Sequence, residues 1–538
     1  MSGAVAAVLV LYVAALLFIA WRAQRRTHGG EDFHLAGRSL GPWAAGISST
    51  ASSESGWVTL GAVGMTYVHG ISGLWYAPGC LLGYLINLYV VAPRLRQLSL
   101  EQRSLTLADV LSRRWGDPRH VVRLTAVAIV VASMMTYVAA QMTAAGKAIE
   151  STLGIGALSL GGLELSPYAL GVLVGALVIT AVTALGGFRS VAWTDLFQGL
   201  LMAAALVALP LYAVASLGGF GALWSGLAAA NPHFLSATGG MVGSALLGFI
   251  VGELGIGLGY PGMPHVVTRY MAARSEEDLR RMRLIGVLWG VAVFYGAGLV
   301  GLAARVMVPA LPDPEQGLMV VAMRLLPPAL AGLMLAAVIS AILSTVSSQL
   351  LVAASSVSYD VVEGVLGRHP DEQRSLRLGR LTVAGVGVLG LALALAETRM
   401  VFWFVLFAWS VLGASFAPLV LLAISRGAMN RFGALAGMLT GAGVSVVWKL
   451  GRGGEAASGL GVPLGVLAAA VALALLAAFT RRLEGGNLVA LATAAGLTLL
   501  SWWLVSLPSL AYLYELVPAF ALALLAALGV ARLTRRWA

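Results

Sequence analysis

Charged residues are scarce in this sequence, and cysteine is almost absent. Only 11% of the 538 residues are Asp, Glu, Lys or Arg, whereas 59% are hydrophobic, and the mean hydropathy is +0.89. A soluble domain carries about 25% charged residues, so this composition excludes an ordinary soluble protein and indicates an all-α polytopic membrane protein. The single cysteine, Cys80, excludes an internal disulfide.

Several motifs of energy-driven pumps and metalloenzymes are also missing. The chain has no HExxH, CxxC, Walker loop or other ATP-binding signature. We therefore expect neither an enzyme nor a primary pump, and no covalent cofactor.

Long apolar stretches dominate what is present. Reading them with a minimum span of about 18–20 residues predicts about 15 transmembrane helices. They fall at 3–22, 42–66, 72–92, 120–147, 165–186, 190–217, 242–268, 281–308, 327–358, 379–397, 401–424, 428–449, 463–480, 485–506 and 509–531.

Most cationic side chains fall in alternate loops between these spans and in the carboxyl-terminal tail. They occupy the segments 22–38, 94–123, 269–283, 368–380 and 532–536. By the positive-inside rule, this pattern predicts an inner (plasma) membrane protein with an external amino terminus and a cytoplasmic carboxyl terminus. The net charge of +11 is thus a topology signal, and we expect a lipid bilayer but no nucleic acid as a partner.

A polar run interrupts the second predicted span. Residues 48–57 read SSTASSESGW and contain seven hydroxyl or carboxyl side chains. Such groups at bilayer depth are costly unless they face protein, water or an ion, so the run indicates a functional site.

A second span is interrupted in a corresponding position. Residues 252–264 read GELGIGLGYPGMP, and five glycines with two prolines oppose a continuous helix. Each interrupted span begins a group of five helices, 42–217 and 242–424, and an odd number of helices inverts the second group. Paired broken helices in inverted repeats predict a secondary transporter with a site at the midplane. Residues 1–41 and 425–538 are then peripheral.

A third polar run follows in the second group. Hydroxyls at 344–348 (STVSS) place Ser344, Ser347 and Ser348 on one helix face. Hydroxyls and the carbonyls of broken helices are hard oxygen donors, which suit a weakly bound monovalent cation rather than zinc or copper.

The chain resembles the sodium:solute symporter family, and within it the sodium/proline symporter branch. The resemblance covers most of the chain and rests on these segments: DFHLAGRSLGPW (32–43), SESGW (53–57), YVAAQ (137–141), GGFRSVAWTD (186–195), GLGYPGMPH (257–265), AVISAILSTVSSQLLVAASS (337–356), AWSVLGASFAPLVL (408–421), GALAGMLTGAGVSVVWK (433–449) and YELVPAF (514–520).

The resemblance implies a leucine-transporter-type fold, with two inverted five-helix repeats plus peripheral helices, and Na+ as the coupling ion. The implied sodium ligands are the backbone oxygens of Ala51, Glu54 and Ala341 and the hydroxyls of Ser344 and Thr345. A second sodium site, present in some relatives, is matched here by Asp195, Ser344, Ser347 and Ser348.

The resemblance also implies a substrate pocket and a gate. The pocket comprises Ser55, Gly56, Trp57, Tyr137, Gln141, Tyr260 and Pro264. Arg38 is either a cytoplasmic gate or an anchor at the membrane interface.

The sequence departs from the proline branch in three places. The branch has aspartate where this chain has Ser53, and a residue such as methionine at Glu54. It tends to have an aromatic residue at Ile256. Two extra spans, within 463–506, precede YELVPAF and are expected to be peripheral.

The function predicted on these grounds is sodium-coupled import of a small organic solute, proline or a related amino acid, by alternating access. One alternative is a proton-coupled transporter that uses Glu54, and another is a sodium symporter for a different amino acid or a carboxylate. Simpler structural roles are also open. Ser344 and Thr345 can bond to carbonyls one turn earlier, and Asp195 can pair with Arg189.

Overall fold

The computed structural model is an almost entirely helical bundle. It describes residues 3–153, 158–160, 163–396, 401–425, 427, 429–452, 484–507, 510 and 513–537. Within these residues, 12 helices are long and apolar enough to cross a membrane. One of them, 167–216, spans two predicted helices, 165–186 and 190–217, and another, 57–102, contains the predicted span 72–92 and the end of the span 42–66. The predicted span 463–480 lies outside the described residues.

The amino-terminal part of the chain supplies eleven α-helices and one short hairpin. The helices are α1 (Gly3–Gln24), α2 (Gly30–Leu35), α3 (Pro42–Ala51), α4 (Ala62–His69), α5 (Tyr76–Ile86), α6 (Ala92–Gln102), α7 (Leu107–Arg114), α8 (Val121–Leu153), α9 (Pro167–Ser216), α10 (Phe220–Ala230) and α11 (Gly243–Gly255). The antiparallel strands β1 (Leu158–Leu160) and β2 (Leu163–Leu165) precede α9.

The remaining part continues the bundle. Its helices are α12 (Pro264–Met271), α13 (Glu276–Met307), α14 (Gly317–Leu325), α15 (Pro328–Ser355), α16 (Glu372–Ala396), α17 (Val401–Ala423), α18 (Arg431–Arg452), α21 (Gly485–Val505) and α22 (Leu516–Leu533).

Both predicted helix interruptions are present. The first span consists of α3, the segment 52–56, a π-helical turn η2 (Trp57–Gly61) and α4. The second consists of α11, a 3₁₀ segment η6 (Ile256–Gly262) and α12. Glycine is required in η6 because a Cβ on Gly262 would lie 2.6 Å from the backbone nitrogen of Ala417, so helix α17 packs directly against this backbone.

Several helix boundaries differ from the predicted ones, and two of these differences have a local cause. The predicted break between 186 and 190 is a kink inside α9, where Gly187 adopts φ +56° with its backbone against Phe33. Helix α13 begins at Glu276, five residues before the predicted start. The Ser275 hydroxyl accepts a hydrogen bond from the Asp278 N–H, and three acidic residues occupy the first turn, so local capping starts the helix early.

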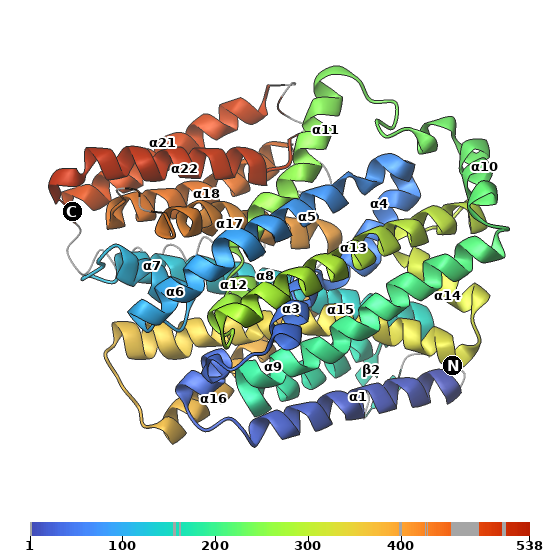
Figure 1. The fold of residues 1–538 in the computed structure, drawn as a ribbon, viewed down its shortest axis with the longest axis horizontal. Coiled ribbons are helices and arrows are strands. Elements are labelled where there is room, and N and C mark those ends of the chain that lie inside the picture. Colours follow the sequence, from blue (N-terminus) through green and yellow to red (C-terminus); the bar gives the residue numbers. More distant parts are fainter. Residues whose placement is uncertain are drawn as a thin grey trace.

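Helix α15 lies inside the bundle and packs against α9, α8 and α1. Figure 1 shows α1 and α16 on one side of the bundle, and α18, α21 and α22 grouped at the opposite side. The interrupted helices meet α8, α15 and α17 between these two sides. The division into repeats at 42–217 and 242–424 stays a prediction.

Candidate functional site

The break after α3 exposes backbone groups that the rest of the bundle satisfies. The Gly56 N–H donates to Gln141 Oε1 on α8 at 2.8 Å, and the Trp57 N–H donates to Ser55 Oγ at 3.1 Å. The Tyr137 hydroxyl, also from α8, reaches Ser55 Oγ at 3.3 Å. Four of the predicted pocket residues thus hold the broken helix against α8.

The predicted sodium ligands come together where α3 ends against α15. Ser344 Oγ donates to the carbonyl oxygens of Ala51 and Ala341, at 3.2 Å each, and Thr345 Oγ1 donates to the Ala341 oxygen at 3.2 Å. The Glu54 carbonyl is one turn further along and accepts from the Val58 N–H at 3.3 Å. Thr345 therefore makes only the one-turn backbone bond, whereas Ser344 also bridges the two helices.

Asp195 on α9 meets the second polar face, but an arginine accompanies it. Its Oδ2 accepts from Ser48 Oγ at 2.6 Å and from Arg269 Nη2 at 3.0 Å. Arg269 also donates to Ser48 Oγ at 3.0 Å and bonds to Ser348 Oγ. The proposed alternative partner, Arg189, instead pairs with Asp32 at 3.0 Å.

Arg269 is the residue that the sequence prediction placed wrongly. It was counted with the cytoplasmic loop 269–283, yet it belongs to α12 and is 0% exposed. The sequence signal that places Arg269 in a helix is its position five residues after Pro264, because Pro264 starts the helix that follows the break.

Ser347 and Ser348, two other members of the predicted second ion site, bond to the backbone of their own helix α15. Ser347 Oγ and Ser348 Oγ donate to the Ser344 carbonyl oxygen at 3.2 and 2.7 Å. Asp195 Oδ1 is buried and has no hydrogen-bond partner among the described residues. The second sodium site stays a prediction, and Arg269 Nη2 already bonds to Asp195 Oδ2 and Ser348 Oγ.

The carboxylate of Glu54 lies at the centre of a hydroxyl cluster. Its Oε1 accepts from Tyr84 and Tyr260, at 2.7 Å each, and from Ser53 at 2.9 Å. Tyr84, on α5, was not predicted. Ser53, the position where the proline branch has its acid, therefore supports Glu54 in this chain.

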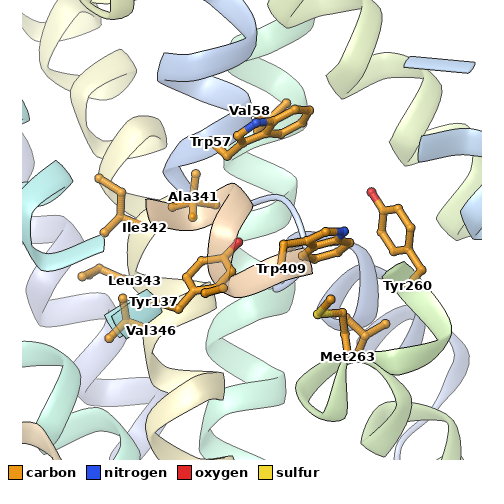
Figure 2. Close-up of a cluster of buried hydrophobic side chains, with 14 of the residues drawn as sticks. Trp57, Val58, Tyr137, Tyr260, Met263, Ala341, Ile342, Leu343, Val346 and Trp409 are labelled. Atoms are coloured by element: carbon orange, nitrogen blue, oxygen red, sulfur yellow. The ribbon is translucent and has the colours of Figure 1, made fainter. Parts of the chain in front are cut away.

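A small cavity of about 20 Å³ adjoins this cluster. Figure 2 shows Trp409 between Tyr137 and Tyr260, with Trp57 above them in that view. The rings of Tyr260 and Trp409 are 4.9 Å apart, edge to face. The complete lining is Ser53, Glu54, Trp57, Cys80, Tyr137, Ile256, Tyr260, Val405, Leu406 and Trp409.

Three of the predicted pocket residues, Trp57, Tyr137 and Tyr260, line this cavity directly. Trp409 was missed, although its segment carries the family resemblance. Its indole N–H donates to the Ile256 carbonyl oxygen at 3.2 Å. Trp409 thus supplies an aromatic ring beside Ile256, the position at which the proline branch tends to have an aromatic residue.

Pro264 does not line this cavity. It borders a second cavity together with Thr106, Thr268, Ser355 and His34, whose Nδ1 lies 2.8 Å from Ser355 Oγ. Three of the predicted pocket residues thus line the aromatic cavity and Pro264 lines the second cavity, whereas Ser55, Gly56 and Gln141 line neither.

Arg38 ties together three segments at the basic end of the bundle. Its guanidinium donates to Ser99 Oγ at 3.0 Å, to the Ser104 carbonyl at 2.8 Å and to the Met271 carbonyl at 3.2 Å. Next to it, the Leu40 N–H donates to the Ala272 carbonyl at 3.1 Å. The loop before α3 is thereby fastened to the ends of α6 and α12.

Comparison with known proteins agrees with this geometry. The model of the sodium:solute symporter family matches residues 33–441. The osmoregulated proline transporter OpuE of Bacillus subtilis is 32% identical over 443 residues, 81% of this chain and 87% of that protein. The sodium/proline symporter of Staphylococcus aureus is 34% identical over 448 residues, 82% of this chain and 84% of the relative.

A solved structure extends the agreement to the fold. The substrate-bound, outward-open form of a Na+-coupled sialic acid symporter superposes with a TM-score of 0.66 at 19% identity, covering 91% of this chain and 98% of the other. The fold is thus the leucine-transporter type that the sequence predicted. With most of its length matched by the family model and by relatives of this identity, the chain belongs to the sodium:solute symporter family.

Proposed function

We propose that this sodium-coupled symporter imports proline or a related small amino acid by alternating access. One observation carries the proposal: the broken helix at 51–57 contributes both to the oxygen cluster at α15 and to the aromatic cavity. An ion and a solute bound there share one element, so each changes the affinity for the other. The proline transport named for the relatives makes proline the first candidate substrate.

Sodium is assigned to the junction of α3 and α15. Its ligands are the backbone oxygens of Ala51, Glu54 and Ala341 and the hydroxyls of Ser344 and Thr345. These hard, neutral oxygens suit Na+, and bonds to both helices would hold α3 and α15 together in one conformation.

The energy available from one ion is sufficient for concentrative uptake. A membrane potential of about 100 mV supplies roughly 2.3 kcal/mol per charge. A tenfold sodium gradient adds about 1.4 kcal/mol, and the two together support roughly 500-fold accumulation of a neutral zwitterion.

Solute binding requires a change in conformation. The aromatic cavity is about 20 Å³, which is roughly the room that one water molecule needs and too little for an amino acid. The contacts of Arg38 close the basic end of the bundle, which we assign to the cytoplasm together with the carboxyl terminus. Arg38 then acts as a gate that opens in the inward-facing state.

A second sodium at Asp195 is a separate part of the proposal. Asp195 Oδ1 is free to accept an ion, while Oδ2 is bonded to Arg269. Two ions per solute would square the accumulation that one ion supports.

Uptake into proteoliposomes tests the coupling. Radiolabelled proline should accumulate with an inward sodium gradient and not with potassium in its place. Accumulation driven by a proton gradient without sodium would instead support the proton-coupled alternative, which the buried Glu54 carboxylate favours. Sodium-driven uptake of other solutes without uptake of proline would support sodium coupling and exclude proline as the substrate.

A further inference from the structure

Glu54 is a buried acid whose carboxylate, among the residues that the structure describes, accepts side-chain hydrogen bonds only from hydroxyl groups. It is 1% exposed, and it forms no ion pair with any of the residues that the structure describes. Several other buried acids are paired, whereas Asp360, like Glu54, forms no ion pair among the described residues. Asp109 pairs with Arg123, Asp195 with Arg269, and Glu515 with Lys449. A buried carboxylate without a counter-charge is costly, and it is neutralised either by a proton or by a cation that enters from outside the protein.

The surroundings of Glu54 indicate which kind of cation this is. The cavity that it lines has four aromatic walls, supplied by Trp57, Tyr137, Tyr260 and Trp409. No lysine, arginine or histidine belongs to this lining, as far as the structure describes the chain. Aromatic faces attract organic cations, most strongly those whose charge is spread over carbon-bearing nitrogen.

The carboxylate is held in place on the cavity wall. Three hydroxyls converge on Oε1, and one of them belongs to Tyr260, whose ring stands edge to face with both Tyr84, at 5.0 Å, and Trp409, at 4.9 Å. The same tyrosine thus fixes the acid and forms part of the aromatic wall. This arrangement positions a negative charge beside apolar ring surfaces before any solute enters.

We propose that the Glu54 carboxylate and the surrounding rings bind the ammonium group of the transported solute. The substrate class is then small amines with a compact apolar body, such as cyclic secondary amines, and the amine rather than the carboxylate determines recognition. This inference rests on the proposed function, since it assigns the aromatic cavity as the solute site.

Binding to the purified, sodium-saturated protein tests the proposal with three matched probes. Proline has an ammonium and a carboxylate, pyrrolidine keeps only the ammonium, and cyclopentanecarboxylate keeps only the carboxylate. The wild-type protein should bind proline and pyrrolidine in preference to cyclopentanecarboxylate. Glu54→Gln should weaken binding of both amines by at least about tenfold, because the buried ammonium group loses its counter-charge. Binding of cyclopentanecarboxylate should not be weakened.

Controls separate this role from folding and from ion binding. Glu253→Gln removes another acid, partly buried on α11, which does not line the cavity, and it should leave proline affinity unchanged. Glu54→Asp keeps the charge and should retain part of the amine preference. The sodium concentration that half-maximally raises the melting temperature should be the same in Glu54→Gln and the wild type.

Three results would overturn the proposal: equal proline affinity in Glu54→Gln, equal wild-type affinity for proline and cyclopentanecarboxylate, or a loss in Glu54→Gln that high sodium reverses. If the wild type fails to accumulate proline but binds pyrrolidine through Glu54, the amine class stands and the proposed substrate falls. If proline accumulates equally well in Glu54→Gln, the proposed function stands and this inference falls.

Discussion

At the scale of single residues, three polar groups buried in the bundle have different kinds of partner. Asp195 has its cation built into the protein, because Arg269 reaches it from α12. Within the described part of the chain, Glu54 has hydroxyl partners and no cationic one, which is why we propose that it binds a cationic ligand. The hydroxyls at the α3–α15 junction carry no charge and can exchange their carbonyl bonds for a metal ion. The three groups therefore suit three different tasks within one helix bundle.

Removing either hydroxyl from the assigned sodium site should raise the sodium requirement. Ser344→Ala and Thr345→Ala each delete an oxygen ligand, with a cost of about 1–2 kcal/mol, or roughly a tenfold higher half-saturating sodium concentration. Sodium dependence of proline uptake measures the effect. Ser340→Ala is the matched control, because Ser340 lies on the same helix and bonds to Tyr12 instead. Unchanged sodium activation in both site variants would contradict the assignment.

Replacing one partner of the Asp195–Arg269 pair should destabilise the protein more than replacing both partners. Asp195→Asn leaves the fully buried guanidinium without its counter-charge, a loss of about 3–5 kcal/mol, which appears as a lower melting temperature. The double variant Asp195→Asn/Arg269→Gln should recover part of that loss. Additive effects of the two substitutions would show that the pair does not act as a unit.

The proposed second sodium site at Asp195 is tested by the ion stoichiometry. If Asp195 Oδ1 binds a second sodium, the reversal potential of the folded double variant should correspond to one sodium per solute and that of the wild type to two. Equal stoichiometry in the two proteins would exclude a second ion at Asp195.

At the scale of elements, the two interrupted helices depend on close backbone packing. A Cβ on Gly257 in η6 would overlap the carbonyl oxygen of Gly79 on α5, and Gly262 packs in the same way against α17. These glycines place the Tyr260 ring between α5 and α17, so the aromatic cavity depends on them.

Gly257→Ala should therefore separate η6 from α5. We expect the variant to lose solute binding while it still inserts into the membrane. Gly529→Ala on α22 is the control, because a Cβ there meets no atom within 4 Å. The yield of folded protein after detergent extraction and proline binding by that fraction are the measurements. Normal binding in Gly257→Ala would show that the cavity tolerates this displacement.

The sequence predicts these interruptions but not the pairs that they bring together. A polar run such as 48–57 contrasts with its apolar neighbours, and a glycine- and proline-rich run such as 252–264 opposes helix formation locally. The contacts of Glu54 with Tyr260 and of Asp195 with Arg269 join residues far apart in the chain, so no local pattern encodes them. Arg269 was placed in a loop because charge alone usually marks the membrane boundary.

At the scale of the whole molecule, the solute site is nearly closed and the basic end is fastened. The aromatic cavity holds about 20 Å³, and Arg38 joins the loop before α3 to α6 and α12. Transport then requires that α3 and its partners move relative to α5, α12 and α17. A conformational change of this kind alters the exposure of every residue that lines the cavity.

Cys80 is a native reporter of that change, because it is the single cysteine of the chain and lines the aromatic cavity. Sodium should speed its reaction with a membrane-impermeant maleimide added from outside, because we expect bound sodium to favour the outward-open conformation. Proline added with sodium should protect Cys80, because the solute fills the cavity.

Arg38→Ala should instead speed labelling of Cys80 from the cytoplasmic side in inside-out vesicles, because the substitution frees the loop from Ser99, Ser104 and Met271. Labelling that is independent of sodium, proline and Arg38 would contradict alternating access at this cavity, and Cys80→Ser sets the background for each rate.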